Sequence, residues 1–183
     1  MKAVNNDSFD NSWFNPGRGR FIQLIWYIVN AVLFNSYLFP FSYLKKIILN
    51  LFGARIGIGV VIKPKVSIKY PWKLSVGDYS WIGENVWIDN LASVSIGATC
   101  CLSQGAMLLT GNHNYKKTTF DLMIGEIILE NGVWIGSQST VCPKVTCKSH
   151  SILSVGSVAT SNLEPYSVYQ GNPAVFIKLR VIE

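Results

Sequence analysis

The side chains that could carry acid–base or nucleophilic chemistry are few in this chain of 183 residues. It contains two histidines, His113 and His150, and four cysteines. Near neutral pH an imidazole can take the proton of a hydroxyl group, which is a weak nucleophile while it keeps that proton. Which histidine could do so depends on the elements that position it.

The cysteines are Cys100, Cys101, Cys142 and Cys147, and none of their spacings is Cys-x-x-Cys. This excludes a zinc ribbon and a thioredoxin-type site. Two of them are adjacent and no secretory cleavage pattern is present, so we expect reduced thiols in a cytoplasmic protein. Two histidines are too few for a three-histidine zinc site, and no metal cofactor is expected.

Beyond Gly53 the sequence repeats with a period of six, which fits neither a helix nor a plain alternating strand. The repeated position is aliphatic at Ile56, Ile62, Ile68, Val76, Ile82, Ile88, Ile96, Leu102, Leu108, Leu129, Ile135, Val141 and Leu153, with Cys147 in the same series. Four residues after each there is usually a small or branched side chain, and a glycine often follows the aliphatic residue directly.

A six-residue step predicts a solenoid in which three short strands and three corners close one triangular coil. The aliphatic residue points inward, and glycine or asparagine takes the tight turn. The step from Leu108 to Leu129 is 21 residues long, so a loop over residues 110–127 must protrude. His113 falls in this loop, whereas His150 falls in an irregular repeat, and His113 is therefore the first candidate for a general base.

The chain divides near Gly53. Residues 1–72 carry nine basic and two acidic side chains, a net +7, and residues 73–183 carry seven and eight, a net −1. We expect a polar and basic arm over 1–20, an apolar helical segment over 21–52, the β-helix over 53–165 and a C-terminal tail over 166–183. No nucleic-acid-binding motif accompanies the basic half, so no nucleic-acid partner is expected.

Within the apolar segment, 24 residues from Phe21 to Leu44 carry no charge, which is long enough for a membrane span. The polar residues and the proline inside the run argue against one; they are Gln23, Asn30, Asn35, Ser36, Ser42 and Pro40. Aromatic residues with basic flanks suit helices that lie in the membrane interface. Peripheral membrane contact through residues 21–49 and a simple cap on the core both stay open.

Several motifs accompany the repeat between residues 50 and 180. They are Phe52-Gly-Ala-Arg-Ile-Gly57, Tyr70-Pro-Trp72, Trp81-Ile-Gly-Glu84, Thr110-Gly-Asn-His113, Phe120-Asp-Leu122 and Gln170-Gly-Asn-Pro-Ala174. The sequence resembles the hexapeptide-repeat acyltransferases, and within them the colanic acid and exopolysaccharide acetyltransferases; galactoside and maltose acetyltransferases are more distant. The resemblance implies an all-β, left-handed parallel β-helix, acetyl-CoA as co-substrate, and a homotrimer with active sites between subunits.

The resemblance also implies a catalytic role for His113, because Thr110-Gly-Asn-His113 matches the family motif. His113 would deprotonate a sugar hydroxyl that attacks acetyl-CoA directly, without an acyl-enzyme. Cys100 falls at a small inward position, and we expect it to pack rather than react. The oxyanion is expected to accept a hydrogen bond from a backbone N–H at a neighbouring corner.

Residues for coenzyme A are carried over from the family position by position. Those expected to line the pantetheine channel or to meet the phosphates are Trp134, Gly136, Ser137, Val155, Gly156, Thr160, Lys178 and Arg180. The sequence departs from the family at Ser161, where lysine is frequent, and at Val175, where arginine is frequent. These departures weaken the expectation for coenzyme A more than that for the fold.

Acceptor-binding residues are expected on the coils before His113. Asn85, Asp89 and Asn90 stand where the solenoid turns, and their carboxylate and amides suit sugar hydroxyls. Asn and Asp are also ordinary turn residues, and that interpretation is equally good. Four side chains of the loop could close over the acceptor or touch an adjacent subunit; these are Tyr115, Lys116, Lys117 and Asp121.

The function expected from the sequence is acetyl transfer from acetyl-CoA to a sugar hydroxyl, in exopolysaccharide or capsule assembly. One alternative is N-acetylation of an amino sugar or transfer of a longer acyl group. Another is a non-catalytic β-helix that binds or scaffolds at the membrane. We expect a cytoplasmic protein that could contact the inner face of the membrane.

Overall fold

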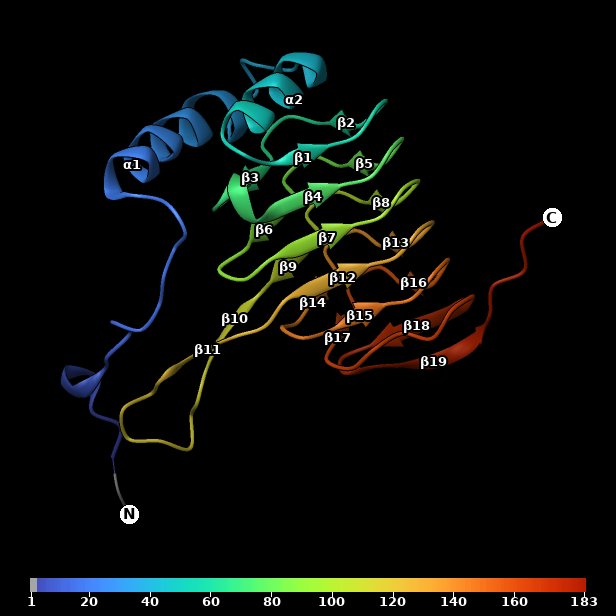
Figure 1. Ribbon diagram of the computed structural model, residues 1–183. Coiled ribbons are helices and arrows are strands. Elements are labelled where there is room, and N and C mark those ends of the chain that lie inside the picture. The colour runs from blue at the N-terminus through green and yellow to red at the C-terminus, as the bar shows by residue number, and fades with distance from the viewer. Residues whose placement is uncertain (1–2) are drawn as a thin grey trace.

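The computed structural model describes residues 3–183, and most of them form a parallel β-helix (Figure 1). Short strands stack into three flat sheets around a prism. The first sheet consists of β1 (Arg55–Ile56), β4 (Leu74–Val76), β7 (Val94–Ile96), β12 (Ile127–Leu129) and β15 (Thr146–Cys147). The second consists of β2 (Val61–Ile62), β5 (Trp81–Ile82), β8 (Cys101–Leu102), β13 (Trp134–Ile135), β16 (Ile152–Leu153), β18 (Ser167–Gly171) and β19 (Ala174–Leu179). The third consists of β3 (Ser67–Ile68), β6 (Trp87–Asp89), β9 (Met107–Leu109), β14 (Thr140–Val141) and β17 (Val158–Ala159).

The core is the column of side chains inside this prism. All fourteen residues of the predicted repeat are buried, and the register pairs them between coils, Ile62 with Ile82 and Ile82 with Leu102. Burying one such aliphatic side chain contributes about 1.5–3 kcal/mol, so the column stabilises every coil against its neighbours. The predicted β-helix is confirmed.

The small residues four positions later are buried as well, except Ala92, which is only half-buried. Ala92 lies at the corner between the third and first sheets, where the insertions occur. The other two corners are tight turns built on a residue with positive φ, such as Asn85 at +58° and Gly156 at +67°. Asparagine and glycine tolerate this conformation best.

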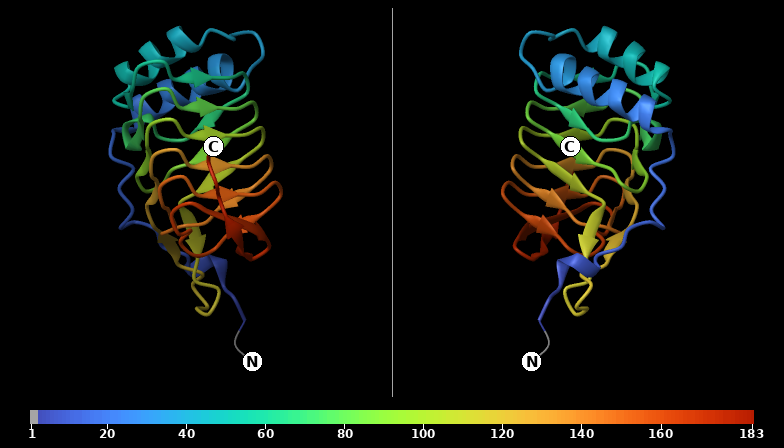
Figure 2. Two further views of the ribbon diagram at one scale, coloured as in Figure 1. Left: turned by 90° about the vertical axis from the view of Figure 1, so that its right-hand side faces the viewer. Right: turned by 90° about the vertical axis from the view of Figure 1, so that its left-hand side faces the viewer.

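Two helices cover the N-terminal end of the prism: α1 (Arg20–Val29), which continues as a π-helical turn η2 (Asn30–Phe34), and α2 (Ser42–Leu51) (Figures 1 and 2). The Trp26 indole N–H donates to the Ile68 carbonyl at 2.8 Å, and the Lys45 ammonium donates to the Lys63 carbonyl at 2.9 Å. Both side chains are fully buried or nearly so, and they fasten the helices to the first coil. Within residues 3–183, none of the helices combines the length and apolarity that crossing a bilayer requires.

The remaining elements lie at the edges of the prism. A hairpin of β10 (Gly111–His113) and β11 (Leu122–Ile124) forms the protruding loop, and short 3-10 turns occupy η1 (Asn6–Ser8) and η3 (Pro71–Lys73). The segment assigned from the sequence to a tail contains β18 and β19, which form an antiparallel hairpin at the end of the second sheet. β18 pairs with β16, so this hairpin extends the β-helix by part of one further coil.

Candidate active site

The protruding loop leaves the corner between the third and first sheets, and His113 stands at the end of its first strand. Thr110 fixes the base of the loop: its hydroxyl donates to the Asp89 carbonyl at 2.9 Å and accepts from the Ala92 N–H at 3.0 Å. In the hairpin register His113 lies opposite Leu122. The base of the loop is therefore anchored to the preceding coil.

The outer part of the loop is closed by its own polar contacts. The Asn114 N–H donates to the Asp121 carbonyl at 2.8 Å, and Lys117 forms an ion pair with Asp121 at 2.7 Å. The hydrogen bond from Lys117 lowers the pKa of the Asp121 carboxyl. Lys117 and Asp121 thus shape the loop, while Tyr115 is 75% exposed at its tip.

The imidazole of His113 is half-buried and held on two sides. Its ring stacks on Phe120 at 4.4 Å between centroids with an interplanar angle of 3°, and Phe9 lies 5.6 Å away on a tilted plane. His113 Nδ1 lies 2.9 Å from the Phe120 carbonyl oxygen. A carbonyl can only accept, so Nδ1 carries the proton in the neutral ring and Nε2 keeps a lone pair. Nε2 is therefore the nitrogen that can accept a proton.

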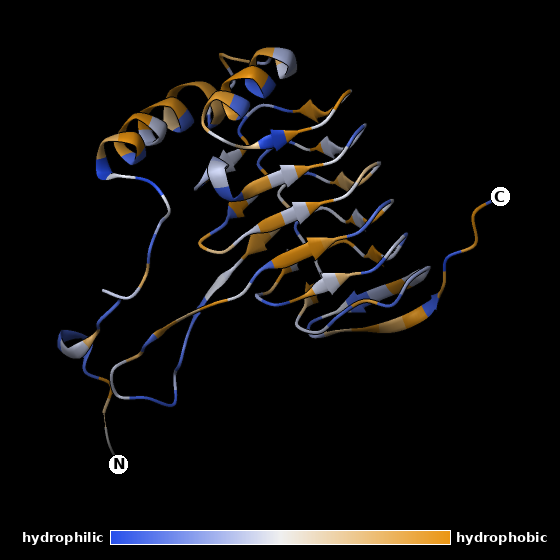
Figure 3. Cartoon of the chain, viewed as in Figure 1, coloured by the Kyte–Doolittle hydropathy of each residue, from blue (hydrophilic) through white to orange (hydrophobic). Residues whose placement is uncertain are grey.

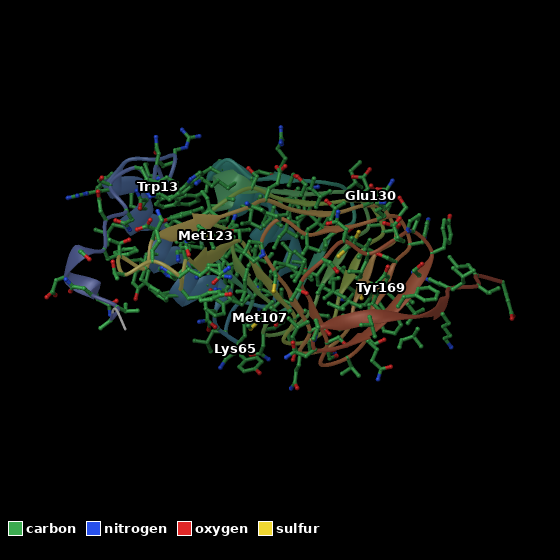
Figure 4. The ribbon with its side chains drawn as sticks, turned by 90° about the horizontal axis from the view of Figure 1, so that it is seen from below. Trp13, Lys65, Met107, Met123, Glu130 and Tyr169 are labelled. Carbon is green, nitrogen blue, oxygen red and sulfur yellow. The ribbon has the colours of Figure 1, made fainter. Side chains whose placement is uncertain are left out.

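His113 borders a cavity of about 650 Å³, a volume in the range of small-molecule sites. The arm, the start of α1, the first coil and the loop all contribute to its wall, through Phe9, Asn11, Phe14, Pro16, Arg18, Gly19, Arg20, Gln23, Lys69, Tyr70, Leu91, His113 and Leu122. The arm runs down the side of the molecule from α1 to the loop, and Figure 4 shows Trp13 and Met123 on the same side, away from Glu130 and Tyr169. The Asn5 N–H bonds to the Thr118 carbonyl at 2.8 Å.

The structure separates the four residues expected to bind the acceptor. Asp89 lies next to the base of the loop and forms an ion pair with Lys69 at 2.9 Å. Tyr115 is in the loop itself, whereas Asn85 is exposed at a different corner, between the second and third sheets. Within one chain, Asn85 and His113 therefore do not share a cavity wall.

The expected role of Asn90 in acceptor binding does not agree with its environment. It is fully buried, its amide oxygen accepts from the Tyr70 N–H at 2.9 Å, and its amide nitrogen donates to the Tyr70 carbonyl at 2.6 Å. Both of its hydrogen-bonding groups are used, so it holds Tyr70 in place and does not reach a sugar. In this structure Asn90 joins two successive coils.

Some of the residues expected to bind coenzyme A lie close together. Trp134, Ser137, Val155 and Gly156 follow the second sheet and its corner with the third sheet on two successive coils. Val155 is 69% exposed, and the space beside Gly156 is open. A Cβ on Gly136, by contrast, would lie 2.6 Å from the Val155 nitrogen, so Gly136 allows the two coils to stack closely.

The other three residues of that set lie elsewhere. Thr160 is exposed after β17, and Lys178 is exposed on β19. The Arg180 guanidinium donates to the carbonyls of Gly132 and His150 at 3.0 and 3.1 Å. Arg180 thus stabilises the corner between the first and second sheets, and this contact competes with a role in phosphate binding.

Comparisons with known proteins show which proteins this chain is similar to. No family model matches the chain. Two structures of a hexapeptide-repeat acetyltransferase from Vibrio cholerae, one with acetyl-CoA bound, superpose with a TM-score of 0.78 at 18% identity, over 87% of this chain and 90% and 87% of theirs. The colanic acid biosynthesis acetyltransferase WcaF of Escherichia coli is 36% identical over 168 residues, which is 92% of both chains.

The chain belongs to the hexapeptide-repeat acetyltransferases. The galactoside O-acetyltransferase of Escherichia coli is 27% identical over 128 residues, covering 68% of this chain and 63% of that one. A maltose O-acetyltransferase structure from Clostridium difficile superposes with a TM-score of 0.70 at 19% identity, over 88% and 86% of the chains. The family expected from the sequence is confirmed.

In this acetyltransferase all four thiols are free, and burial raises the pKa of each, that of Cys147 to about 12. The Cys100 Sγ is buried and lies 2.9 Å from the Glu130 carbonyl. A thiol with a raised pKa carries little thiolate near pH 7, and thiolate is the nucleophilic form. Little thiolate is therefore available on any of the four cysteines, and Cys100 and Cys147 are buried inside the prism.

The sequence does not indicate that the arm lies beside the candidate site. Phe9 packs on His113 across a long stretch of chain, and no local pattern signals such a contact. Phe120 belongs to the motif Phe120-Asp-Leu122, which pointed to the family but not to a role. Its carbonyl is the group that orients His113.

Proposed function

We propose that this protein transfers an acetyl group from acetyl-CoA to a hydroxyl of a sugar during exopolysaccharide assembly, with His113 as the general base. The observation that carries the proposal is the 2.9 Å contact from His113 Nδ1 to the Phe120 carbonyl, which leaves the lone pair of the neutral ring on Nε2, in a side chain that borders the cavity. The relative named for colanic acid biosynthesis supports the process, and the relatives that act on galactosides and maltose support the sugar acceptor.

The proposed reaction is a direct transfer from acetyl-CoA to the acceptor. Nε2 accepts the proton of the acceptor hydroxyl while the oxygen attacks the thioester carbonyl carbon, and an anionic tetrahedral intermediate forms. A backbone N–H at a corner stabilises its oxyanion. The intermediate collapses to the ester, the C–S bond breaks, and the imidazolium returns its proton to the sulfur of coenzyme A.

For coenzyme A, the proposal assigns the channel to Trp134, Ser137, Val155 and Gly156. These residues lie on neighbouring coils, and the Gly156 N–H bonds to the Ser137 carbonyl at 2.9 Å, which fixes their spacing. Their supporting features are the exposure of Val155 and the open space at Gly156.

The test measures thiol release from acetyl-CoA with a panel of sugars, nucleotide sugars and amino sugars, for the wild type, His113→Asn and His150→Asn. We expect His113→Asn to lower kcat by about 10²–10⁴-fold, the usual contribution of a general base. His150 is a matched control, because it lies at another corner, stacked on Tyr166, with a φ of +59° that asparagine adopts readily. Undiminished turnover by His113→Asn would refute the proposal.

We also propose a homotrimer with active sites between subunits. His113 stands at the corner between the third and first sheets, whereas Ser137 and Gly156 stand at the corner between the second and third. A neighbouring subunit could bring the two corners together. Two half-exposed tryptophans on the face of the second sheet, Trp81 and Trp134, offer apolar area for association.

A third proposal is that the enzyme works at the cytoplasmic face of a membrane. Apolar residues are prominent along α1, α2 and their connection (Figure 3), and Tyr37, Leu38 and Phe41 in that connection are each more than half exposed. Positive charge lies near this surface on Lys65, whose ammonium is 4.9 Å from the centre of the Tyr37 ring, and on the exposed Arg20 at the start of α1, and this combination suits anionic lipid. Sedimentation with phosphatidylglycerol vesicles tests membrane binding. The wild type should sediment with the vesicles and Leu38→Glu should stay in the supernatant. Equal binding by the two proteins would contradict the membrane proposal.

A further inference from the structure

A second cavity of about 450 Å³ lies beneath α1, against the third sheet. Its wall consists of Gln23, Leu24, Trp26, Tyr27, Asn30, Ser67, Ile68, Lys69, Tyr70, Trp87 and Asp89. Gln23, Lys69 and Tyr70 also line the cavity of His113, so the two cavities border each other at these three residues. The second cavity therefore lies next to the cavity of His113, on the side of α1.

The lining of the second cavity combines aromatic faces with a few polar groups. Trp87 is 44% exposed and Tyr27 is 71% exposed, so both offer ring surface to a ligand. At the junction, Lys69 and Asp89 form an ion pair of 2.9 Å, which provides a donor and an acceptor side by side. A pyranose ring has the same two kinds of surface, apolar C–H faces and hydroxyl edges.

The cavity is also rigid. Trp26 is fastened to the Ile68 carbonyl at 2.8 Å, and Asn30 accepts from the Ile68 N–H at 3.0 Å and donates to the Ser67 hydroxyl at 3.2 Å. These bonds tie α1 and η2 to the first coil. The cavity is therefore formed before a ligand arrives, which lowers the cost of binding.

We propose that the second cavity binds the sugar next to the one that is acetylated, so that the acceptor is an oligosaccharide of at least two linked units rather than a free monosaccharide. The inference rests on the proposed function, because His113 defines which sugar is acetylated. Trp87 and Tyr27 pack on the neighbouring ring, and Lys69 and Asp89 bind hydroxyls near the linkage.

Kinetics provide the first test. The kcat/KM for thiol release from acetyl-CoA is measured with a panel of methyl hexosides, deoxyhexosides and hexuronides, and with the di- and trisaccharides built from them. We expect the best oligosaccharide to exceed its own constituent monosaccharides by about tenfold or more, and Trp87→Ala to remove most of that advantage while changing the monosaccharide rate less than about twofold. Trp87→Phe should restore part of it.

Tyr27 and Tyr43 provide a matched pair, because they are 71% and 73% exposed on neighbouring helices and only Tyr27 lines the cavity. Tyr27→Ala should lower turnover of the oligosaccharide selectively, and Tyr43→Ala should not. Equal rates for mono- and oligosaccharides in the wild type, or equal losses on both in Trp87→Ala, overturn the proposal.

Binding provides a readout that does not depend on turnover. Saturation-transfer NMR with the same oligosaccharides should show contact with two adjacent rings in the wild type and in His113→Asn, and loss of one ring in Trp87→Ala. Contact with one ring only, or with none in the whole panel, overturns the proposal. Two-ring contact without acetyl transfer would instead refute the proposed function and leave the glycan site standing.

Discussion

At the scale of single residues, the decisive feature is the orientation of one imidazole. The Phe120 carbonyl fixes the tautomer of His113, and the Phe120 ring, stacked at 4.4 Å, fixes its plane. Phe120 adopts a φ of +50°, which is unfavourable for a bulky residue. Such strain is retained where the surrounding structure needs a particular geometry.

This geometry predicts the effect of shortening Phe120. Phe120→Ala removes the stacking surface and lets the ring of His113 rotate away from the acceptor hydroxyl that it would deprotonate. We expect kcat to fall by about tenfold, while the KM for acetyl-CoA stays unchanged, because misplacement near the reacting atoms mainly affects the chemical step. Steady-state kinetics check it, with Phe120→Tyr as the control that keeps the ring; a purely structural loss would change both parameters or the melting temperature.

Two glycines expected in the coenzyme A channel differ in what they do for the fold. A Cβ on Gly136 would lie 2.6 Å from the Val155 nitrogen, whereas a Cβ on Gly156 would meet open space, although its φ of +67° disfavours alanine. Gly136→Ala should therefore lower the free energy of unfolding by about 2–3 kcal/mol and Gly156→Ala by about 1 kcal/mol. Urea unfolding measures both; equal losses would contradict the close stacking at Gly136.

At the scale of elements, the sequence predicts the coils well because each coil repeats one physical requirement. A position that points into a prism must be apolar, so the six-residue period is visible without any partner sequence. The protruding loop was predictable for the same reason, since the break between Leu108 and Leu129 interrupts that period.

Elements that do not repeat were harder to predict. β18 and β19 pair antiparallel and obey no six-residue rule, so the C-terminal segment looked like a tail. Asn90 looked like a sugar ligand because its type suits both a turn and a binding site, and only its bonds to Tyr70 decide between them. The packing of Phe9 on His113 joins distant segments and leaves no local signal.

The helix α2 carries a testable electrostatic consequence of its packing. Burial lowers the pKa of Lys45 to about 8, from 10.5 in the unfolded chain. Below pH 8 the ammonium is protonated in both states, and the folded state bears the full cost of burying its charge. As the pH rises from about 8 to 10.5, the folded chain loses this proton while the unfolded chain keeps it, so stability increases with pH.

Lys45→Met isolates this contribution. Between pH 8 and 10.5 the free energy of unfolding of the wild type should rise relative to that of Lys45→Met, by at most roughly 1.4 kcal/mol per pH unit. Denaturant unfolding of both proteins at several pH values measures the difference. A difference that is constant over this range would show that Lys45 is not buried with its charge.

At the scale of the whole molecule, the three corners of the prism carry different parts of the proposed active site. The loop with His113 leaves one corner, and the residues proposed for coenzyme A follow another, with the third sheet between them. A monomer therefore presents the base and the channel on different edges. Association around a threefold axis offers each edge a complementary one, as heterologous contacts in a closed ring do.

Complementation between two inactive variants tests this arrangement. His113→Asn removes the base, and Val155→Glu places a carboxylate at a position that is 69% exposed in the proposed channel, where it repels the phosphates of coenzyme A. Each variant alone should be nearly inactive. The two are co-expressed with different tags and purified through both tags, so that every trimer contains both kinds of subunit.

In a mixed trimer of either composition, one of the three interfaces joins an intact His113 to an intact channel. The mixed trimers should therefore recover about one third of the wild-type activity per trimer. If base and channel belonged to the same subunit, every site would lack one of them and no activity would return. Light scattering on the same samples gives the mass of the assembly, and a monomer or dimer at working concentration would contradict the trimer itself.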